Sequence, residues 1–190
     1  MVFWNIGIDG GGKADGFATT SAARASGDSP AHALPNDGKF AANSEHPLVL
    51  LPYGQVHPGE FQARSMPGPS FVEIKVPHKK YRDLFLFFTS AEGGSLVSLR
   101  LDFRDGTSEV SSIDLPDYYR EPSPSEKNLF ALAPNLAKWN AAGKLAEADH
   151  HYIYGWKIAS DAHRILQSMT LTKTAPGYLV FWGATGESAD

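Results

Sequence analysis

The chain has 190 residues, a formal net charge of −4 and 42% hydrophobic residues. This apolar content is too high, and the net charge too low, for a disordered chain. Acidic residues slightly outnumber Lys and Arg, whereas nucleic-acid-binding proteins carry clustered basic residues. No apolar run approaches the roughly 20 residues that cross a membrane. We therefore expect one globular domain over residues 1–190, with no membrane span and no nucleic-acid partner.

The sequence contains no cysteine. This excludes disulfides, zinc–thiolate sites, iron–sulfur clusters and a cysteine nucleophile, but it does not fix the compartment. Residues 1–13 lack the basic start and the apolar stretch of a secretory signal peptide. We therefore expect either a mature form or an excised domain.

Residues 9–43 are mostly small and polar, and we expect loops there with one short strand around residues 16–21. The glycine-rich opening carries Asp9 and Asp15, and Asp28 follows. Carboxylate oxygens on a flexible loop suit Ca²⁺, which takes 6–8 oxygen ligands. The alternative is a solvated loop with Asp–Gly turns, and the spacing of an EF-hand is absent.

From residue 47 onward the sequence predicts a series of strands. Residues 96–103 alternate, with Val97 and Leu99 on the face expected to point into the core. Asp105–Gly106 then marks a hairpin. Residues 84–89 form a continuous apolar run, which suits a strand covered on both faces. The predicted strands are 48–51, 71–76, 84–89, 96–103, 108–115, 152–158, 165–172 and 178–183.

Helical composition occurs only in residues 135–149, which are rich in Ala, Leu, Lys and Glu, and we expect one short helix there. The Pro- and Ser-rich residues 121–126 are expected to form a loop. Many strands separated by turns, with at most one short helix, predict an all-β antiparallel β-sandwich. The long loops at the ends of such sheets are where we expect the function.

Four pieces of the sequence follow one another in the order found in jelly-roll modules of the galactose-binding-domain-like type. The first piece is a Gly/Asp opening with an Ala-Leu-Pro segment (Asn5–Gly16 and Ala33–Pro35), and the second is a core strand with its hairpin (Leu84–Phe88, Val97–Phe103 and Asp105–Thr107). The third is a Tyr-Ile-Tyr-Gly segment (Tyr152–Ile158), and the fourth is a pair of final strands (Ile165–Leu171 and Leu179–Thr185). The chain therefore resembles the modules of this type that are appended to bacterial and fungal glycoside-active enzymes. The resemblance implies a jelly roll of about eight strands, carbohydrate as ligand, a structural calcium near the opening loop and an extracellular or periplasmic location. The stretch over residues 116–149 is longer than the pattern implies.

Aromatic residues in predicted loops mark the candidate ligand site. Tyr118, Tyr119 and Arg120 follow the strand over residues 108–115, and Trp139 lies in the long insertion. Tyrosine rings stack on the C–H faces of sugars, and arginine donates hydrogen bonds in two directions. The alternatives are a tyrosine pair that packs a loop onto the sheet edge and a tryptophan that anchors the short helix. We expect these four residues to contact carbohydrate.

The sequence carries no distinct enzymatic motif. His150 and His151 are adjacent before a predicted strand and point to opposite faces, so they suit one metal ion poorly. Gln55-Val-His57 matches a short segment of jelly-roll polysaccharide lyases, but the arginine-rich strand and the late tyrosine motif of those enzymes are missing. The serine-nucleophile motif G-x-S-x-G is absent.

The sequence therefore predicts a non-catalytic, lectin-like carbohydrate-binding or accessory module that holds glycan by aromatic stacking and polar loop residues. Two alternatives stay open. One is a structural sandwich that braces the catalytic domain of a larger protein, which predicts an exposed apolar patch. The other is a jelly-roll enzyme acting on polysaccharide as a lyase or hydrolase, which predicts a cleft with converging histidines or carboxylates.

Overall fold

The computed structural model describes residues 16–51, 53, 64–66, 68–139, 145–174 and 177–189, and the structural statements below concern these residues. Its elements in chain order are α1 (Thr20–Ala25), the 3-10 turn η2 (Pro30–His32), β1 (Lys39–Phe40), β2 (Val49–Leu50), β3 (Arg64–Met66), β4 (Ser70–Lys75), β5 (Tyr81–Ala91), β6 (Ser95–Phe103), β7 (Ser108–Leu115), β8 (Leu129–Trp139), β9 (Leu145–Ala159), β10 (Leu166–Lys173) and β11 (Tyr178–Ser188).

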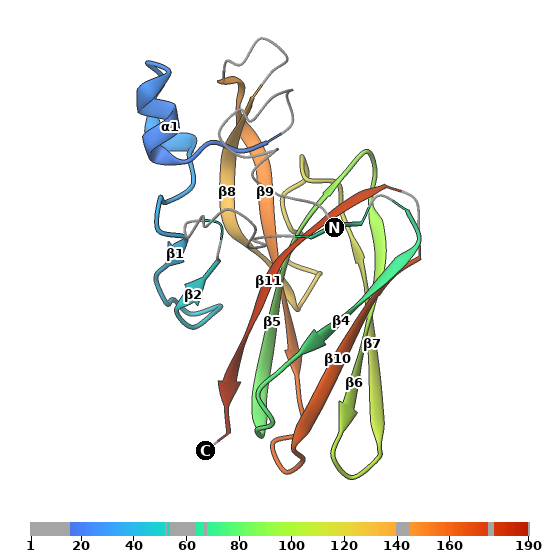
Figure 1. The fold of residues 1–190 in the computed structure, drawn as a ribbon. Helices are drawn as coiled ribbons and strands as arrows, with labels where there is room; N and C mark the ends of the chain where they lie inside the picture. Colours follow the sequence, from blue (N-terminus) through green and yellow to red (C-terminus); the bar gives the residue numbers. More distant parts are fainter. Residues whose placement is uncertain are drawn as a thin grey trace.

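Two antiparallel sheets pack face to face as a sandwich (Figure 1). The four-stranded sheet has the order β4–β10–β6–β7, and the five-stranded sheet has the order β3–β11–β5–β9–β8. The short strands β1 and β2 pair only with each other. The predicted all-β antiparallel sandwich with one short helix is thus confirmed. The last strand of the chain, β11, lies inside its sheet between β3 and β5 and not at an edge.

Buried and exposed side chains alternate along β6, which shows which face of the four-stranded sheet points into the core. Along β6, every second residue from Val97 to Phe103 is at most 2% exposed, whereas Arg100 between them faces solvent. The inward side chains pack with β5, β9 and β11 of the other sheet in one apolar cluster. The predicted orientation of this strand is therefore confirmed, and the cluster forms the core of the sandwich.

The strand β5 is buried on both faces, as its continuous apolar run predicts. Leu86 and Phe88 point into the core between the sheets. Phe85 and Phe87 point the other way, into a second apolar cluster that includes residues of the N-terminal segment 17–53. Figure 1 shows α1, β1 and β2 of this segment beside β8. The N-terminal segment therefore covers the outer face of the five-stranded sheet.

The helix expected within residues 135–149 is wrong. Residues 135–139 end the strand β8, and residues 145–149 begin the strand β9 that pairs with it. Cross-strand pairing here overrides a composition that favours a helix. Pro134 and Asn135 interrupt the pairing between Ala133 and Leu136, and Asn135 has a φ of 56°, which asparagine tolerates better than most residues.

The one helix, α1, lies instead where loops and a short strand were expected. The side chain of Thr19 begins it by accepting a hydrogen bond from the Ala22 N–H at 3.4 Å. The expected strand around residues 16–21 is reduced to two isolated bridges, which pair Phe17 with Lys138 and Thr19 with Leu34.

Candidate functional site

The segment that follows β7, residues 116–120, is tied to the turn between β5 and β6. The Tyr118 N–H donates a hydrogen bond to the Ser90 carbonyl at 2.7 Å. One carboxylate oxygen of Asp117 accepts from the Gly93 N–H at 2.7 Å, and the other accepts from the Tyr119 N–H at 3.2 Å. Gly93 has a φ of 103°, which glycine adopts without a steric penalty. Asp117 therefore fixes the backbone that carries the tyrosine pair.

A second tether comes from β9. The Tyr154 hydroxyl lies 2.7 Å from the Asp117 carbonyl oxygen and 2.6 Å from the Arg120 carbonyl oxygen. A hydroxyl has one proton, so the two acceptors share it. Burial raises the pKa of Tyr154 above its usual range. The hydroxyl therefore remains a donor to both ends of the segment 117–120 at neutral pH.

The two tyrosine rings and His151 form one aromatic cluster, in which Tyr118 and His151 are stacked and Tyr119 is tilted against both. The Tyr118 ring centroid lies 4.8 Å from that of His151 and 4.4 Å from that of Tyr119, and Tyr119 also lies 4.8 Å from His151. His151 is fully buried, and its Nδ1 lies 2.7 Å from the Leu136 carbonyl oxygen. A carbonyl only accepts, so Nδ1 carries the proton and the imidazole orientation is fixed.

This aromatic cluster contains one buried and one exposed tyrosine. Tyr118 is 8% exposed and Tyr119 is 50% exposed. The Tyr118 hydroxyl accepts a hydrogen bond from Lys138 Nζ at 2.9 Å and donates one to the Tyr119 hydroxyl at 3.2 Å. Burial raises the pKa of Tyr118, and the hydrogen bond from Lys138 offsets this only in part. Tyr119 therefore presents a ring to solvent on a rigid, hydrogen-bonded support.

Arg120 lies beside the aromatic cluster and is already engaged. Its guanidinium forms an ion pair with Glu126, which also accepts a hydrogen bond from the Ser123 N–H at 2.7 Å. The hydrogen bond from Arg120 is the main reason that the pKa of Glu126 is lowered. About half of the Arg120 side chain is exposed. Its Nη1 also donates a hydrogen bond to the Glu121 carbonyl at 3.4 Å. Only the N–H groups outside these two interactions are therefore available to a ligand.

The structure brings three of the four expected contact residues together. Tyr118, Tyr119 and Arg120 lie in one short segment, and the backbone of Trp139 ends β8 directly after Lys138, which bonds to Tyr118. The side chain of Trp139 lies outside the described residues. Since residue 139 ends a strand, the alternative in which it anchors a helix is wrong.

The expected calcium ligands, Asp9 and Asp15, lie outside the described residues, as does Gln55-Val-His57. In the part of the chain that the structure describes, no three His, Asp or Glu side chains converge in a way that could hold a metal ion.

Two residues of the site were missed in the sequence. From the sequence alone, Lys138 falls in the expected helix, and His151 suggests only a poor metal ligand. Both reach the tyrosines because β8 and β9 pair, with Leu136 opposite His151. The signal in the sequence is the alternation of apolar residues over 152–158, which marks a strand directly after His151.

No protein-family model matches the sequence, and no curated protein matches it. Among the described residues, no helix is long and apolar enough to cross a membrane. The fold established here is thus an all-β antiparallel sandwich of two main sheets, and the site is defined by its own geometry.

Proposed function

We propose that this chain is a non-catalytic carbohydrate-binding module of the galactose-binding-like, jelly-roll type, and that Tyr119 is its main contact residue. The observation that carries the proposal is the half-exposed Tyr119 ring, held on the Tyr118–His151 stack. The C–H face of a pyranose packs on such a ring, and a ring that is already immobile loses little conformational entropy on binding.

Polar groups around the ring support the same ligand class. The Tyr119 hydroxyl and the remaining N–H groups of Arg120 can bond to sugar hydroxyls at the edge of the ring. Trp139, at the end of β8, belongs to the same proposal as a contact residue. A structural calcium held by Asp9 and Asp15, an extracellular or periplasmic location and a larger glycoside-active parent protein belong to the same proposal.

The alternative of a bracing domain gains little from the exposed apolar residues. Phe71 and Val110, each about two-thirds exposed, lie on β4 and β7, the two edge strands of the four-stranded sheet. Two further strands separate them, so these two do not form one contiguous patch. Leu48 and Leu50 are also exposed, but they lie at β2 in the N-terminal segment. No observation favours this alternative over glycan binding.

The test is a glycan-array screen of the chain in calcium and again in chelator, followed by titration of the best glycan. Tyr119→Ala is expected to weaken binding by at least about tenfold, and Tyr119→Phe, which keeps the ring, by much less. Phe71→Ala is the matched control, because it removes another exposed ring, on β4 at the opposite edge of the four-stranded sheet from β7. Equal binding by Tyr119→Ala and Phe71→Ala would remove Tyr119 from the site. No binding by the folded chain would favour the bracing domain.

A further inference from the structure

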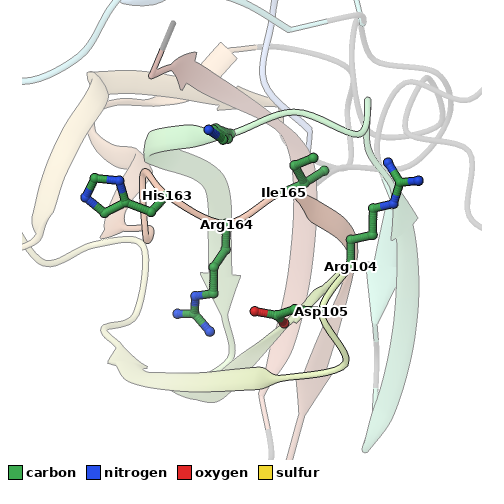
Figure 2. A pocket seen from close by; sticks show the side chains of 6 residues that line it. Arg104, Asp105, His163, Arg164 and Ile165 are labelled. Carbon is green, nitrogen blue, oxygen red and sulfur yellow. The ribbon is translucent and has the colours of Figure 1, made fainter.

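A second polar site lies at the opposite end of the sandwich. Arg104 and Asp105 follow β6, whereas Tyr119 follows β7, its antiparallel partner. The eight residues of β7 therefore separate the two places by about 26 Å. An open, shallow cavity of about 320 Å³ lies at this end, lined by Lys80, Arg104, Asp105, His163, Arg164 and Ile165. Figure 2 shows Asp105 next to Arg164, with Arg104 and His163 on either side of Ile165.

The acidic groups at this end are already occupied. Asp105 accepts hydrogen bonds from the Thr107 N–H at 2.9 Å and the Thr107 hydroxyl at 2.5 Å. These bonds are the main reason that the pKa of Asp105 is lowered. Arg164 pairs with both Asp161 and Glu109, and its guanidinium lies 3.9 Å from the Phe103 ring centroid. Arg164 is therefore neutralised by two carboxylates and acts as a structural residue.

Two cations of the cavity lining, Lys80 and Arg104, are not paired. Within the described residues their side chains make no hydrogen bond or ion pair, and neither does the His163 side chain. This contrasts with Arg82, Arg120 and Arg164, each of which pairs with a carboxylate. Other exposed basic residues of the described chain, such as Arg24 and Lys127, also lack a carboxylate partner. Lys80 and Arg104 differ from them because both line one cavity.

The backbone places the two free cations around one residue. Lys80 pairs with Ile165 in an antiparallel bridge, and the Arg104 N–H donates a hydrogen bond to the Ile165 carbonyl at 2.9 Å. The Leu166 N–H bonds to the Lys79 carbonyl at 2.9 Å. Three chain segments are thus paired side by side, so the backbone positions of Lys80 and Arg104 are fixed before any ligand arrives.

We propose that this cavity binds an oxyanion group (sulfate, phosphate or carboxylate), with Lys80 and Arg104 as its charged donors. Arginine bonds such groups through two parallel N–H donors, and lysine supplies a compact charge. The oxyanion is either a free inorganic ion or an acidic substituent of a glycan. This site does not depend on the Tyr119 site, since no residue is shared.

The test follows the backbone amide signals of Lys80, Asp105 and Ile165 by NMR while sodium sulfate is added at constant ionic strength. A sulfated oligosaccharide and its desulfated counterpart are titrated in the same way. The test variant is Lys80→Met with Arg104→Gln. The matched control is Lys127→Met with Arg24→Gln, which removes the same charges from exposed residues outside the cavity.

Saturable shifts with sulfate, or with the sulfated but not the desulfated oligosaccharide, are expected. The test variant should weaken that binding at least about tenfold, and the control less than about twofold. Sulfate alone identifies a free ion as sufficient, whereas binding of only the sulfated oligosaccharide identifies an acidic glycan. Absence of saturable shifts with every probe, or equal losses in both variants, overturns the proposal. Binding that Tyr119→Ala removes should persist in the test variant, so the two sites fail independently.

Discussion

Lys173 and Ser70 are paired directly across β10 and β4, on the face of the four-stranded sheet that points into the sandwich. The Lys173 side chain is 1% exposed, and neither its Nζ nor the Ser70 Oγ has a hydrogen-bond partner among the described residues. Burial lowers the pKa of Lys173 below its usual value. One end of the core thus holds an unsatisfied ammonium, which opposes folding.

Lys173→Met is expected to raise the free energy of unfolding at pH 7 by about 1 kcal/mol or more, because methionine keeps the aliphatic chain and removes the buried charge. Urea unfolding measures this change. Lys127→Met, at an exposed position, should be neutral within about 0.5 kcal/mol. A loss of stability in Lys173→Met would mean that the ammonium has a favourable partner.

The buried Lys173 amine should also make the free energy of unfolding depend on pH. Between its lowered folded pKa and the ordinary lysine value of 10.5, the unfolded chain binds more protons at Lys173 than the folded chain. The contribution of Lys173 to the free energy of unfolding therefore rises as pH increases through that window. It falls as pH decreases, until Lys173 is protonated in both the folded and the unfolded chain. Comparing the slope of unfolding free energy against pH in wild type and Lys173→Met isolates the effect. Parallel slopes would contradict it.

For Tyr118 and Tyr154 we expect the opposite effect at alkaline pH, where the free energy of unfolding should fall as pH rises. Burial raises the pKa of each hydroxyl above the usual value of 10.0, so the folded chain keeps protons that the unfolded chain loses. Their stabilising contribution is present below pH 10 and is lost as pH rises above it. Ultraviolet titration should show these hydroxyls ionising only as the chain unfolds. Tyr154→Phe should reduce that step, and an unchanged titration curve would refute the assignment.

Gly155 is expected to tolerate no side chain. It pairs with Phe130 across β8 and β9, and a Cβ at residue 155 would lie 2.0 Å from the Phe130 ring. Gly155→Ala should cost about 1–3 kcal/mol in unfolding free energy, as overpacked cores do. Adding Phe130→Leu should cost less in the Gly155→Ala background than in wild type, since the smaller side chain makes room. Additive costs in this double-mutant cycle would rule out the predicted clash.

Asp117 is expected to act as a positioning residue for Tyr119. Asp117→Ala removes the acceptors for the Gly93 and Tyr119 N–H groups and should cost about 1–2 kcal/mol of stability. Glycan affinity should also fall, because the ring is no longer held in place. Asp117→Asn keeps one acceptor oxygen and should recover part of both losses. If neither substitution alters affinity at a temperature where both variants are folded, the loop does not depend on this carboxylate.

The sandwich could be predicted because most of its strands carry a local hydrophobic pattern that is visible in the sequence. Period-two alternation in β6 and the two-sided apolar run of β5 follow directly from which faces are buried. The strand β8 could not be predicted in this way. Its composition favours a helix, Pro134 and Asn135 break its alternation, and its pairing with β9 is a property of the whole sheet.

The candidate site was predictable only in part for the same reason. Tyr118, Tyr119 and Arg120 are neighbours in sequence, so their shared position in a loop is visible without a structure. Lys138 and His151 join them from the β8–β9 pair, which is brought there by non-local contacts. The cavity at the other end combines residues from three separate turns, and no spacing in the sequence links Lys80 with Arg104 and His163.

The central position of β11 has a consequence for synthesis of the chain. Leu84 pairs with Gly186 and Ala91 pairs with Tyr178, so one edge of β5 stays open until the last strand leaves the ribosome. A nascent chain that ends before residue 178 exposes an apolar strand edge in the middle of its sheet, which invites pairing with other chains. Such distant pairing also slows folding. Truncation before residue 178 should therefore direct the chain to aggregation and proteolysis.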